Sequence, residues 1–322
     1  MKKFVLLIFL FIIALIFHLS MGTVTISPDA VVFALFNIGD PADHVIIYQF
    51  RLPRALVGII SGSGLATAGM ILQVLVRNPL ASPDVIGITK GASLFAVTVL
   101  LVFPSAPFFF IPLSAMIGAM ATMLLLFLLT TRMHMSGTAL ALTGIGISAL
   151  CTSLIELCTV KFPINVNQAL LWLSGSLWGR GYDEVSLGLT VLPLCFIALL
   201  YSRSLSVLQF DDDIAIGLGQ PLMKSRLFWL ILACIITGIC VALVGSIGFI
   251  GLLAPHIAKI LKGGMNRLSL SFAICIGAIL MLVADGIGRT IMHPLEIPVG
   301  LVTAIIGGPY FLLMLWKLRR SV

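Results

Sequence analysis

Among the polar side chains in or beside the apolar segments of this 322-residue chain, Gln73, Glu156, His256 and Asp285 are the ones that could do chemistry. An ionisable group inside a long apolar segment is costly, so each needs a partner or a function. Asp285 precedes Arg289 by four residues, a spacing that places both on one helix face and predicts an ion pair. Glu156 lies near the end of its segment, where its carboxylate can reach water. His256 follows Pro255, so we expect its imidazole to satisfy a freed backbone group rather than to bind a metal.

Signatures of catalysis are missing from the sequence. It contains no H-E-x-x-H, no G-x-S-x-G and no G-x-x-x-x-G-K-[ST] motif, which argues against proteolysis and nucleotide hydrolysis by this chain. The six cysteines lie in apolar segments without a C-x-x-C or Cys/His cluster, as expected of small hydrophobic residues. We therefore expect no catalytic residue, no metal site and no cofactor bound by this chain.

The longest polar interruption in the second half of the chain is Phe210–Arg226, which reads FDDDIAIGLGQPLMKSR. Asp211, Asp212 and Asp213 are placed to cap a helix N-terminus and to complement its dipole. The next residues offer a small apolar face and end at Pro221. Such a segment is too short and glycine-rich to be a stable helix alone, so a docking partner is expected. The alternative is a solvated loop whose charges only keep it out of the bilayer.

Composition defines the class of protein. Hydrophobic residues make up 60% of the chain, charged residues 10%, and the mean hydropathy is +1.19, values typical of a polytopic membrane protein. The net charge of +7 does not indicate nucleic-acid binding, because the basic residues stand at the ends of apolar segments, as the positive-inside rule predicts.

The apolar run Phe4–Phe17 follows Lys2 and Lys3 and fits either a cleaved signal peptide or a retained first span. We favour retention, because an odd number of spans would put the basic C-terminus on the wrong side of the membrane. The further apolar blocks are Leu56–Val76, Ile88–Val102, Phe108–Leu129, Thr138–Thr159, Val185–Tyr201, Leu227–Val244, Ile247–Leu261, Leu268–Val283 and Ile297–Trp316.

Ile247–Leu261 is short enough to be a re-entrant segment instead of a span. If it crosses, most basic residues fall on one side of the membrane and five remain on the other: Arg51, Arg54, Lys161, Arg180 and Arg289. We therefore predict an all-α membrane protein with about ten transmembrane helices and both termini in the cytoplasm. Residues 1–322 form a single domain, and residues 210–226 form a cytoplasmic loop.

Two further patterns concern packing and the membrane surface. Gln168–Trp178 carries two tryptophans and suits an amphipathic helix at the outer interface. Gly58 and Gly62 form a small-x-x-x-small pair that permits close helix approach, and glycines are similarly frequent in other spans.

Several motifs together resemble one family. They are Arg51–Arg54 (RLPR), Arg77–Asp84 (RNPLASPD) with Ile86-Gly87, Leu171–Leu177 (LWLSGSL), Gly248–Leu252 (GFIGL) with Pro255-His256, Leu295–Gly300 (LEIPVG) and Gly307–Pro309 (GGP). In this order, and over nearly the whole chain, they resemble the FecCD-type permeases of bacterial ATP-binding-cassette importers. That family has ten spans per subunit and imports cobalamin, haem and ferric siderophores. Within it, Ala169–Arg180 and His293–Gly308 look closest to the ferric citrate permeases.

The resemblance implies a permease in the bacterial cytoplasmic membrane. Its partners would be a second permease subunit, identical or homologous, two ATPase subunits that use ATP, and an extracytoplasmic substrate-binding protein that delivers a ferric chelate. Cobalamin or haem is the alternative substrate. Two other classes remain: an ion-coupled secondary transporter, which would need Glu156 and Asp285 for transport, and a membrane-embedded enzyme, for which no catalytic pair can be assembled.

The resemblance also assigns roles to residues. Those matching the family's coupling element, which docks on the ATPase, are Asp211, Asp212, Asp213, Ala215, Leu218 and Gly219, with Ile216 where relatives often carry Arg. Those matching basic positions that receive the binding protein are Arg51, Arg54 and Arg289. The small residues Thr143, Gly144 and Gly146 are predicted to form a gate at the cytoplasmic end of the fifth span, provided that two permeases pair.

Overall fold

The computed structural model describes residues 2–107, 109–131, 135–292 and 294–319, and their regular structure is helical with no strand. The elements are α1 (Lys2–Ser20), α2 (Pro28–Leu35), α3 (Pro41–Val45), η1 (Ile46–Arg51), α4 (Leu52–Leu75), α5 (Ile88–Val102), α6 (Phe110–Thr130), α7 (Gly137–Lys161), η3 (Pro163–Asn165), α8 (Val166–Leu173), α9 (Tyr182–Gly188), α10 (Val191–Leu200), α11 (Ser202–Val207), α12 (Asp212–Gly217), α13 (Leu222–Val244), α14 (Ile250–Lys262), α15 (Arg267–Gly288) and α16 (Val299–Arg319).

The described residues contain seven helical stretches that are long and apolar enough to cross a membrane: Lys2–Ser20, Pro41–Leu75, Phe110–Thr130, Gly137–Lys161, Tyr182–Leu200, Leu222–Val244 and Arg267–Gly288. Helix α5 and the segment Val299–Met314 are apolar but shorter. At 1.5 Å per residue, the 13 residues of α14 extend about 20 Å, less than the ~30 Å of hydrocarbon. The all-α membrane prediction is confirmed, whereas the count of about ten spans stays a prediction. Phe108, where we expected one span to begin, lies outside the described residues.

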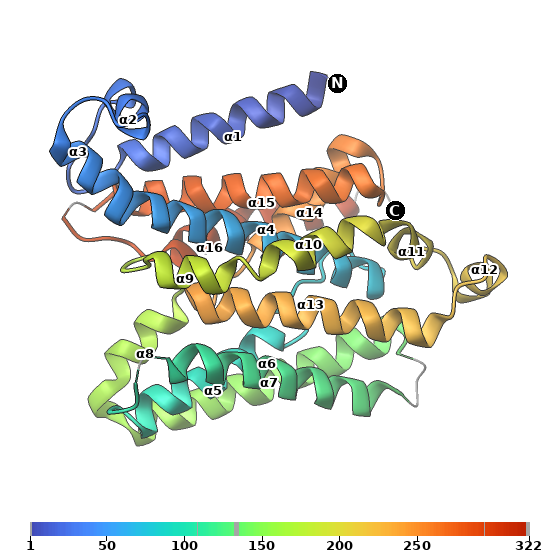
Figure 1. The fold of residues 1–322 in the computed structure, drawn as a ribbon. Helices are drawn as coiled ribbons and strands as arrows, with labels where there is room; N and C mark the ends of the chain where they lie inside the picture. The colour runs from blue at the N-terminus through green and yellow to red at the C-terminus, as the bar shows by residue number, and fades with distance from the viewer. Residues whose placement is uncertain (1, 108, 132–134, 293, 320–322) are drawn as a thin grey trace.

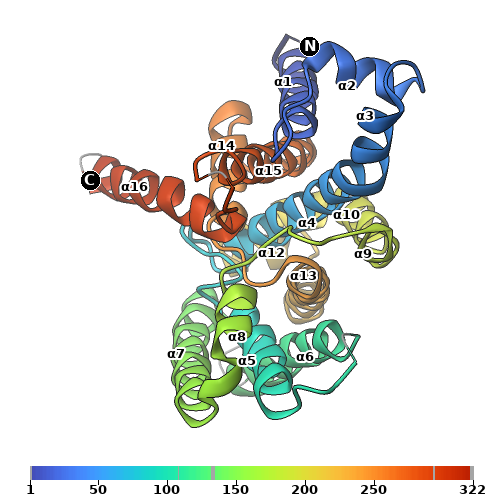
Figure 2. The same cartoon turned by 90° about the vertical axis from the view of Figure 1, so that its left-hand side faces the viewer.

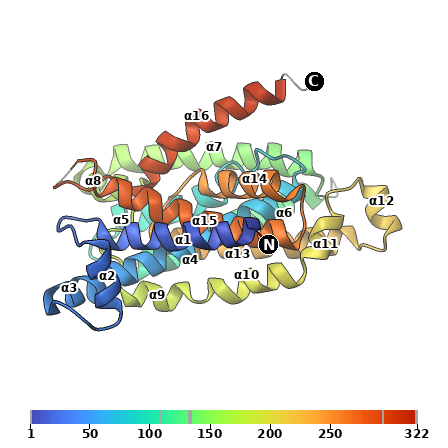
Figure 3. The ribbon, with the colours of Figure 1, turned by 90° about the horizontal axis from the view of Figure 1, so that it is seen from above.

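The long helices run side by side (Figure 1). Helices α2, α3 and α8 lie at one end of the bundle, which we call the α8 end. Helices α11 and α12 lie at the opposite end, the α12 end, where α1 begins and α16 ends (Figures 1 and 3). Helix α1 packs along α15 and buries Leu7, His18 and Leu19, so it is part of the packed bundle.

Helix α4 is the centre of the bundle, with 89% of its most apolar stretch buried, against 28% for α1. It contacts α13, α14 and α15 (Figure 2). Glycines make this possible, since a Cβ on Gly62 would collide with the backbone of Gly277, and one on Gly69 with the backbone of Gly251. The predicted close packing of small residues is therefore confirmed.

Two irregular segments meet beside the centre of the bundle. Helix α13 ends before Gly245, and α14 begins only after Phe249, which adopts a left-handed φ of 66°. The segment after α8 runs next to this break, because Ser176 N donates to Val244 O at 2.8 Å and Gly300 N donates to Gly175 O at 3.1 Å. The polar backbone atoms of these segments thus bond to each other, as irregular backbone within a membrane bundle must.

The predicted amphipathic segment Gln168–Trp178 is only partly helical. Helix α8 ends at Leu173, and Gly175 follows with a left-handed φ of 68°. A Cβ on Gly175 would crowd the carbonyl of Ser246, so the chain turns where it meets the break between α13 and α14. Trp178 comes after this turn and is exposed.

Candidate functional site

Helix α12 stands at the tip of the α12 end and carries the three predicted aspartates (Figure 1). Asp211 occupies the N-cap position, but its side chain makes no capping hydrogen bond. Asp213 is exposed. The prediction that these side chains cap the helix is thus incorrect for Asp211, and the reason is local: nearby arginines attract the carboxylates. Arg77 Nη1 lies 3.8 Å from Asp211 Oδ1.

Asp212 joins α12 to two long helices. Its Oδ1 accepts from Arg77 Nη2 at 2.6 Å, just beyond the end of α4, and from Arg226 Nη2 at 2.7 Å, in the first turns of α13. Burial acts to raise the pKa of Asp212, but the hydrogen bonds from Arg226 and Arg77 outweigh it, and the pKa lies below the usual value. The carboxylate is therefore charged at neutral pH and holds α12 against the bundle.

The other face of α12 is apolar and uncovered. Ile214, Ile216 and Leu218 are more than half exposed, whereas Ala215 between them is fully buried. Gly219 ends the helix with a left-handed φ of 81°, and no described atom lies within 4 Å of the place where its Cβ would be. A short helix that leaves apolar side chains exposed in this way is suited to docking against another protein.

The predicted gate residues lie on α7 and point in different directions. Gly144 is buried, and a Cβ there would approach Ile86 Cα to 2.7 Å. Gly146 is exposed, with no described atom within 4 Å of the position that a Cβ would take, and Thr143 is half-buried. Gly144 therefore packs within this chain, and Gly146 belongs to the outward surface of α7.

The three predicted docking arginines lie near the α8 end, but the structure places them inside. Arg51 and Arg289 are 5% and 4% exposed. Arg51 donates to the carbonyls of Leu19 and Ser20, and Arg289 donates to His18 O at 2.7 Å and Met21 O at 2.9 Å. Both guanidinium groups thus bind the C-terminal end of α1 and the residues after it, so docking by these arginines stays a prediction.

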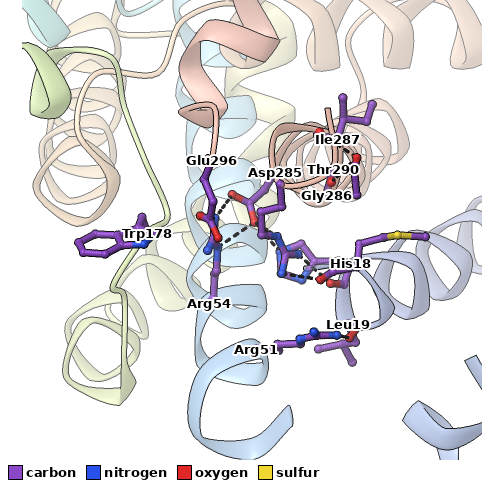
Figure 4. Close-up of polar contacts among 12 residues, drawn as sticks. His18, Leu19, Arg51, Arg54, Trp178, Asp285, Gly286, Ile287, Thr290 and Glu296 are labelled. Carbon is purple, nitrogen blue, oxygen red and sulfur yellow. Dashed lines mark hydrogen bonds and ion pairs between the residues drawn. The ribbon is translucent and has the colours of Figure 1, made fainter. Parts of the chain in front are cut away.

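Asp285 is the hub of a group of charged and polar side chains near the α8 end, which we call the outer charge cluster: His18, Arg54, Asp285, Arg289 and Glu296 (Figure 4). Arg289 Nε lies 3.2 Å from Asp285 Oδ2, which confirms the predicted helical ion pair. Arg54 forms a two-pronged pair with the same carboxylate, with both N–O distances 2.9 Å, and also reaches Glu296 Oε2 at 2.9 Å. His18 Nε2 completes the cluster at 2.9 Å from Asp285 Oδ2.

Sequence reasoning missed His18 and Glu296. His18 is fully buried at the end of α1, and its signal was a lone ionisable residue after a run of apolar residues. Glu296 lies in the LEIPVG motif. Its carboxylate forms an ion pair with Arg54, which also pairs with Asp285. The His18–Asp285 contact spans 267 residues of sequence, so no local pattern could reveal it.

The remaining polar residues have structural surroundings. Gln73 donates to Leu252 O at 3.2 Å and accepts from Lys259 at 2.9 Å. The ring of His256 packs edge-on against Tyr310, with ring centroids 5.9 Å apart, and the described part of the chain shows no hydrogen bond from its imidazole to a freed backbone group. Glu156 is exposed near the end of α7, and its contact with water stays a prediction. Among the described residues, no group of three His, Cys, Asp or Glu side chains could hold a metal ion.

A large cavity of about 880 Å³ opens near the α8 end. Aromatic and polar side chains line it, among them Phe103, Gln168, Trp172, Trp178, Arg180 and Glu296. Since Glu296 also pairs with Arg54, the cavity wall is connected to the outer charge cluster.

A bundle of apolar helices with an exposed apolar helix at one end and a large cavity near the other is the architecture expected of the membrane-spanning part of a transporter. The model of the FecCD transport family matches residues 8–317, and the chain belongs to that family. It is accordingly a multi-pass protein of the inner membrane.

Named relatives and a solved structure agree with this assignment. The chain is 46% identical over 305 residues to the Fe(3+)-citrate import system permease protein YfmE of Bacillus subtilis (strain 168), covering 94% of this chain and 91% of that one. It is 42% identical to the Fe(3+) dicitrate transport system permease protein FecD of Escherichia coli (strain K12), covering 86% of each. A structure in an inward-facing conformation, described as a metal-chelate type ABC transporter, superposes with a TM-score of 0.88 at 28% identity, covering 98% of this chain and 99% of that one.

Proposed function

We propose that this chain is the permease subunit of an ATP-binding-cassette importer that carries a ferric chelate, with ferric citrate as the favoured substrate. The observation that carries the proposal is the exposed apolar face of α12, held on the bundle by Asp212 in a chain of the FecCD family. Two ATPase subunits would supply the energy, one on each permease, and ATP would be bound by them rather than by this chain.

The membrane topology is part of the proposal. We infer ten passes by α1, α4, α5, α6, α7, the pair α9–α10, α13, α14, α15 and α16, with both termini in the cytoplasm. The start of α1, the end of α16 and helix α12 lie at one end of the bundle, which supports this orientation. Residues 1–322 form one domain, whose coupling loop is residues 210–226.

A second permease, identical or related, would pack on the surface formed by α7 and α16, which lie on the same side of the molecule in two views (Figures 2 and 3). This surface is apolar and exposed, and it includes Leu142, Ile145 and Gly146 of α7 and Ile305 of α16. Thr143, Gly144 and Gly146 would form the gate between the two subunits, and an open glycine such as Gly146 allows a close helix approach there.

The substrate-binding protein would dock at the α8 end, above the large cavity. Arg54 keeps 11% of its side chain exposed, while Arg51 and Arg289 hold the end of α1. Docking by Arg51, Arg54 and Arg289 therefore requires that the outer charge cluster opens or that its shape, rather than free charge, is recognised.

The substrate assignment follows the names of YfmE and FecD, with cobalamin or haem as the alternative. An ion-coupled secondary transporter is less well supported, because Asp285 is fully engaged by two arginines and a histidine. Neutralising Glu156 is the direct test of that alternative.

The test is reconstitution into proteoliposomes with a partner permease, the ATPase and the binding protein. We expect ATP-dependent uptake of radioactive ferric citrate that exceeds uptake of ferric hydroxamates, haem and cobalamin. Uptake driven by an ion gradient without ATP would contradict the proposed class, and preference for another chelate would correct the substrate alone.

A further inference from the structure

We propose that the α4–α5 loop, residues 77–87, is the mechanical link between the coupling helix α12 and the gate helix α7. The proposal rests on the proposed function in two respects, namely that α12 receives the ATPase and that α7 forms the gate. It adds the residues through which a displacement of α12 reaches the gate: Arg77 and Asp212 at one end of the loop, and Asp84 and Ser148 at the other.

The first contact is the ion pair between Asp212 and Arg77. Arg77 also donates through Nε to Leu208 O at 3.3 Å, so its guanidinium bonds both to α12 and to the segment before it. Arg77 is the first residue of the loop and adopts a left-handed φ of 54°, which is uncommon for a residue with a side chain. The backbone there is held in a particular turn, and the turn directs the side chain toward Asp212.

The loop itself is compact and bonded internally. Asn78 Oδ1 accepts from Leu80 N at 2.9 Å, Ile86 N donates to Ser82 O at 3.1 Å, and Ile88 N donates to Pro83 O at 3.1 Å. Ala81, Ser82, Ile86 and Gly87 are buried. A segment with these bonds transmits a displacement of its first residue instead of absorbing it.

The last contact is with α7. Ser148 Oγ donates to Asp84 O at 3.1 Å, and Gly144 faces Ile86 so closely that a Cβ would come within 2.7 Å of Ile86 Cα. The loop and α7 therefore cannot separate or slide by more than a small distance without losing this fit. Gly146, on the outward surface proposed for the gate, is two residues from each of these contact points.

A second link also leaves Asp212, through Arg226 to α13. Helix α13 packs against α4, α5 and α6, so it stabilises the bundle around α12. Of these two links, the α4–α5 loop is the one that contacts the predicted gate residue Gly144. We therefore assign the transmission of the α12 displacement to Arg77 and not to Arg226.

A double-mutant cycle in the reconstituted complex tests the link. Arg77→Gln removes the pair with Asp212, and Ser148→Ala removes the bond to Asp84. Each should lower substrate imported per ATP hydrolysed by about twofold to thirtyfold, the range of mutations along a coupling path. The double variant should be no worse than the more impaired single variant, because both changes break the same link. Independent effects at separated sites would instead multiply.

Arg267→Gln is the matched control, since Arg267 is exposed, starts α15 outside the coupling loop and forms no ion pair with the described residues. It should import like the wild type. Wild-type import per ATP in Arg77→Gln, or multiplicative losses in the double variant, would overturn the link. If the wild-type complex shows no ATP-dependent import at all, the proposed function fails, and the link is then judged by hydrogen exchange.

Hydrogen exchange needs only the purified chain in lipid nanodiscs. Asp212→Asn, which removes the charge but keeps the size of a partly exposed side chain, should raise exchange in residues 77–87 and in α7 around 144–148. Unchanged exchange in α7 would overturn the link whatever the transport assay shows.

Discussion

The outer charge cluster makes a quantitative prediction about Asp285. Replacing Asp285 by Asn keeps the shape of the side chain and removes its charge. Arg54 would lose a two-pronged ion pair with N–O distances of 2.9 Å, and Arg289 would lose a partner at 3.2 Å. His18 would lose the carboxylate oxygen that Nε2 contacts at 2.9 Å.

The expected cost follows from the burial of the site. Asp285 is 1% exposed and Arg289 4%, so water cannot replace the lost charge. Removing one partner of a buried ion pair costs about 3–5 kcal/mol, because the other charge stays buried without compensation. Glu296 still balances part of the charge of Arg54, which favours the lower part of that range. At about 2 °C per kcal/mol for a chain of this size, a cost of about 3–4 kcal/mol should lower the melting temperature by about 6–8 °C.

The measurement is thermal unfolding of the purified permease in one detergent, followed by tryptophan fluorescence. Glu156→Gln is the matched control, since it neutralises an exposed carboxylate that forms no ion pair with the described residues, and it should change stability by less than about 0.5 kcal/mol. A melting temperature for Asp285→Asn within about 2 °C of the wild type would refute the reasoning that this cluster anchors α1 to α4 and α15.

Three further predictions concern packing, the gate and docking. Gly69→Val should abolish stable expression, because its side chain would collide with the backbone of Gly251, and normal yield and melting would contradict the packing of α4 on α14. Gly146→Leu should leave the monomer's melting temperature unchanged while reducing uptake or assembly of the permease pair, so unaltered uptake and ATPase stimulation would exclude a close contact there. Arg51→Glu should destabilise the isolated chain by several kcal/mol, since buried carbonyls lose their donor. A stable variant that only slows binding-protein association, measured against ionic strength, would favour docking instead.

Much of the fold could be predicted from local patterns in the sequence. Runs of apolar residues predicted the helices, the four-residue spacing predicted the Asp285–Arg289 pair, and small residues predicted the tight packing at Gly62. Each of these depends on neighbours within one or two helical turns or on a residue's own size, so the information is present in a short stretch of sequence.

Long-range partners could not be predicted in this way. Arg54 is 231 residues from Asp285, and only the packing of α4 against α15 brings them together. The positive-inside rule singled out Arg51 as an outer residue, but it is silent on whether such a residue faces water or binds the carbonyls that end α1. The aspartates at the start of α12 were expected to cap it, and Asp212 instead bonds to Arg77, which follows α4, and to Arg226 of α13.

The central claim is that α12 receives the ATPase and that its motion drives import. Gly219→Arg tests it most directly, because Gly219 is open to solvent at the end of α12 and the new side chain would obstruct docking without a clash inside the chain. Gly263→Arg is the matched control, with a similar left-handed φ of 73° and no described atom within 4 Å of its Cβ position. In the reconstituted complex we predict that Gly219→Arg loses ATP-dependent uptake of ferric citrate while Gly263→Arg retains it. Equal uptake by Gly219→Arg and the wild type would contradict the claim.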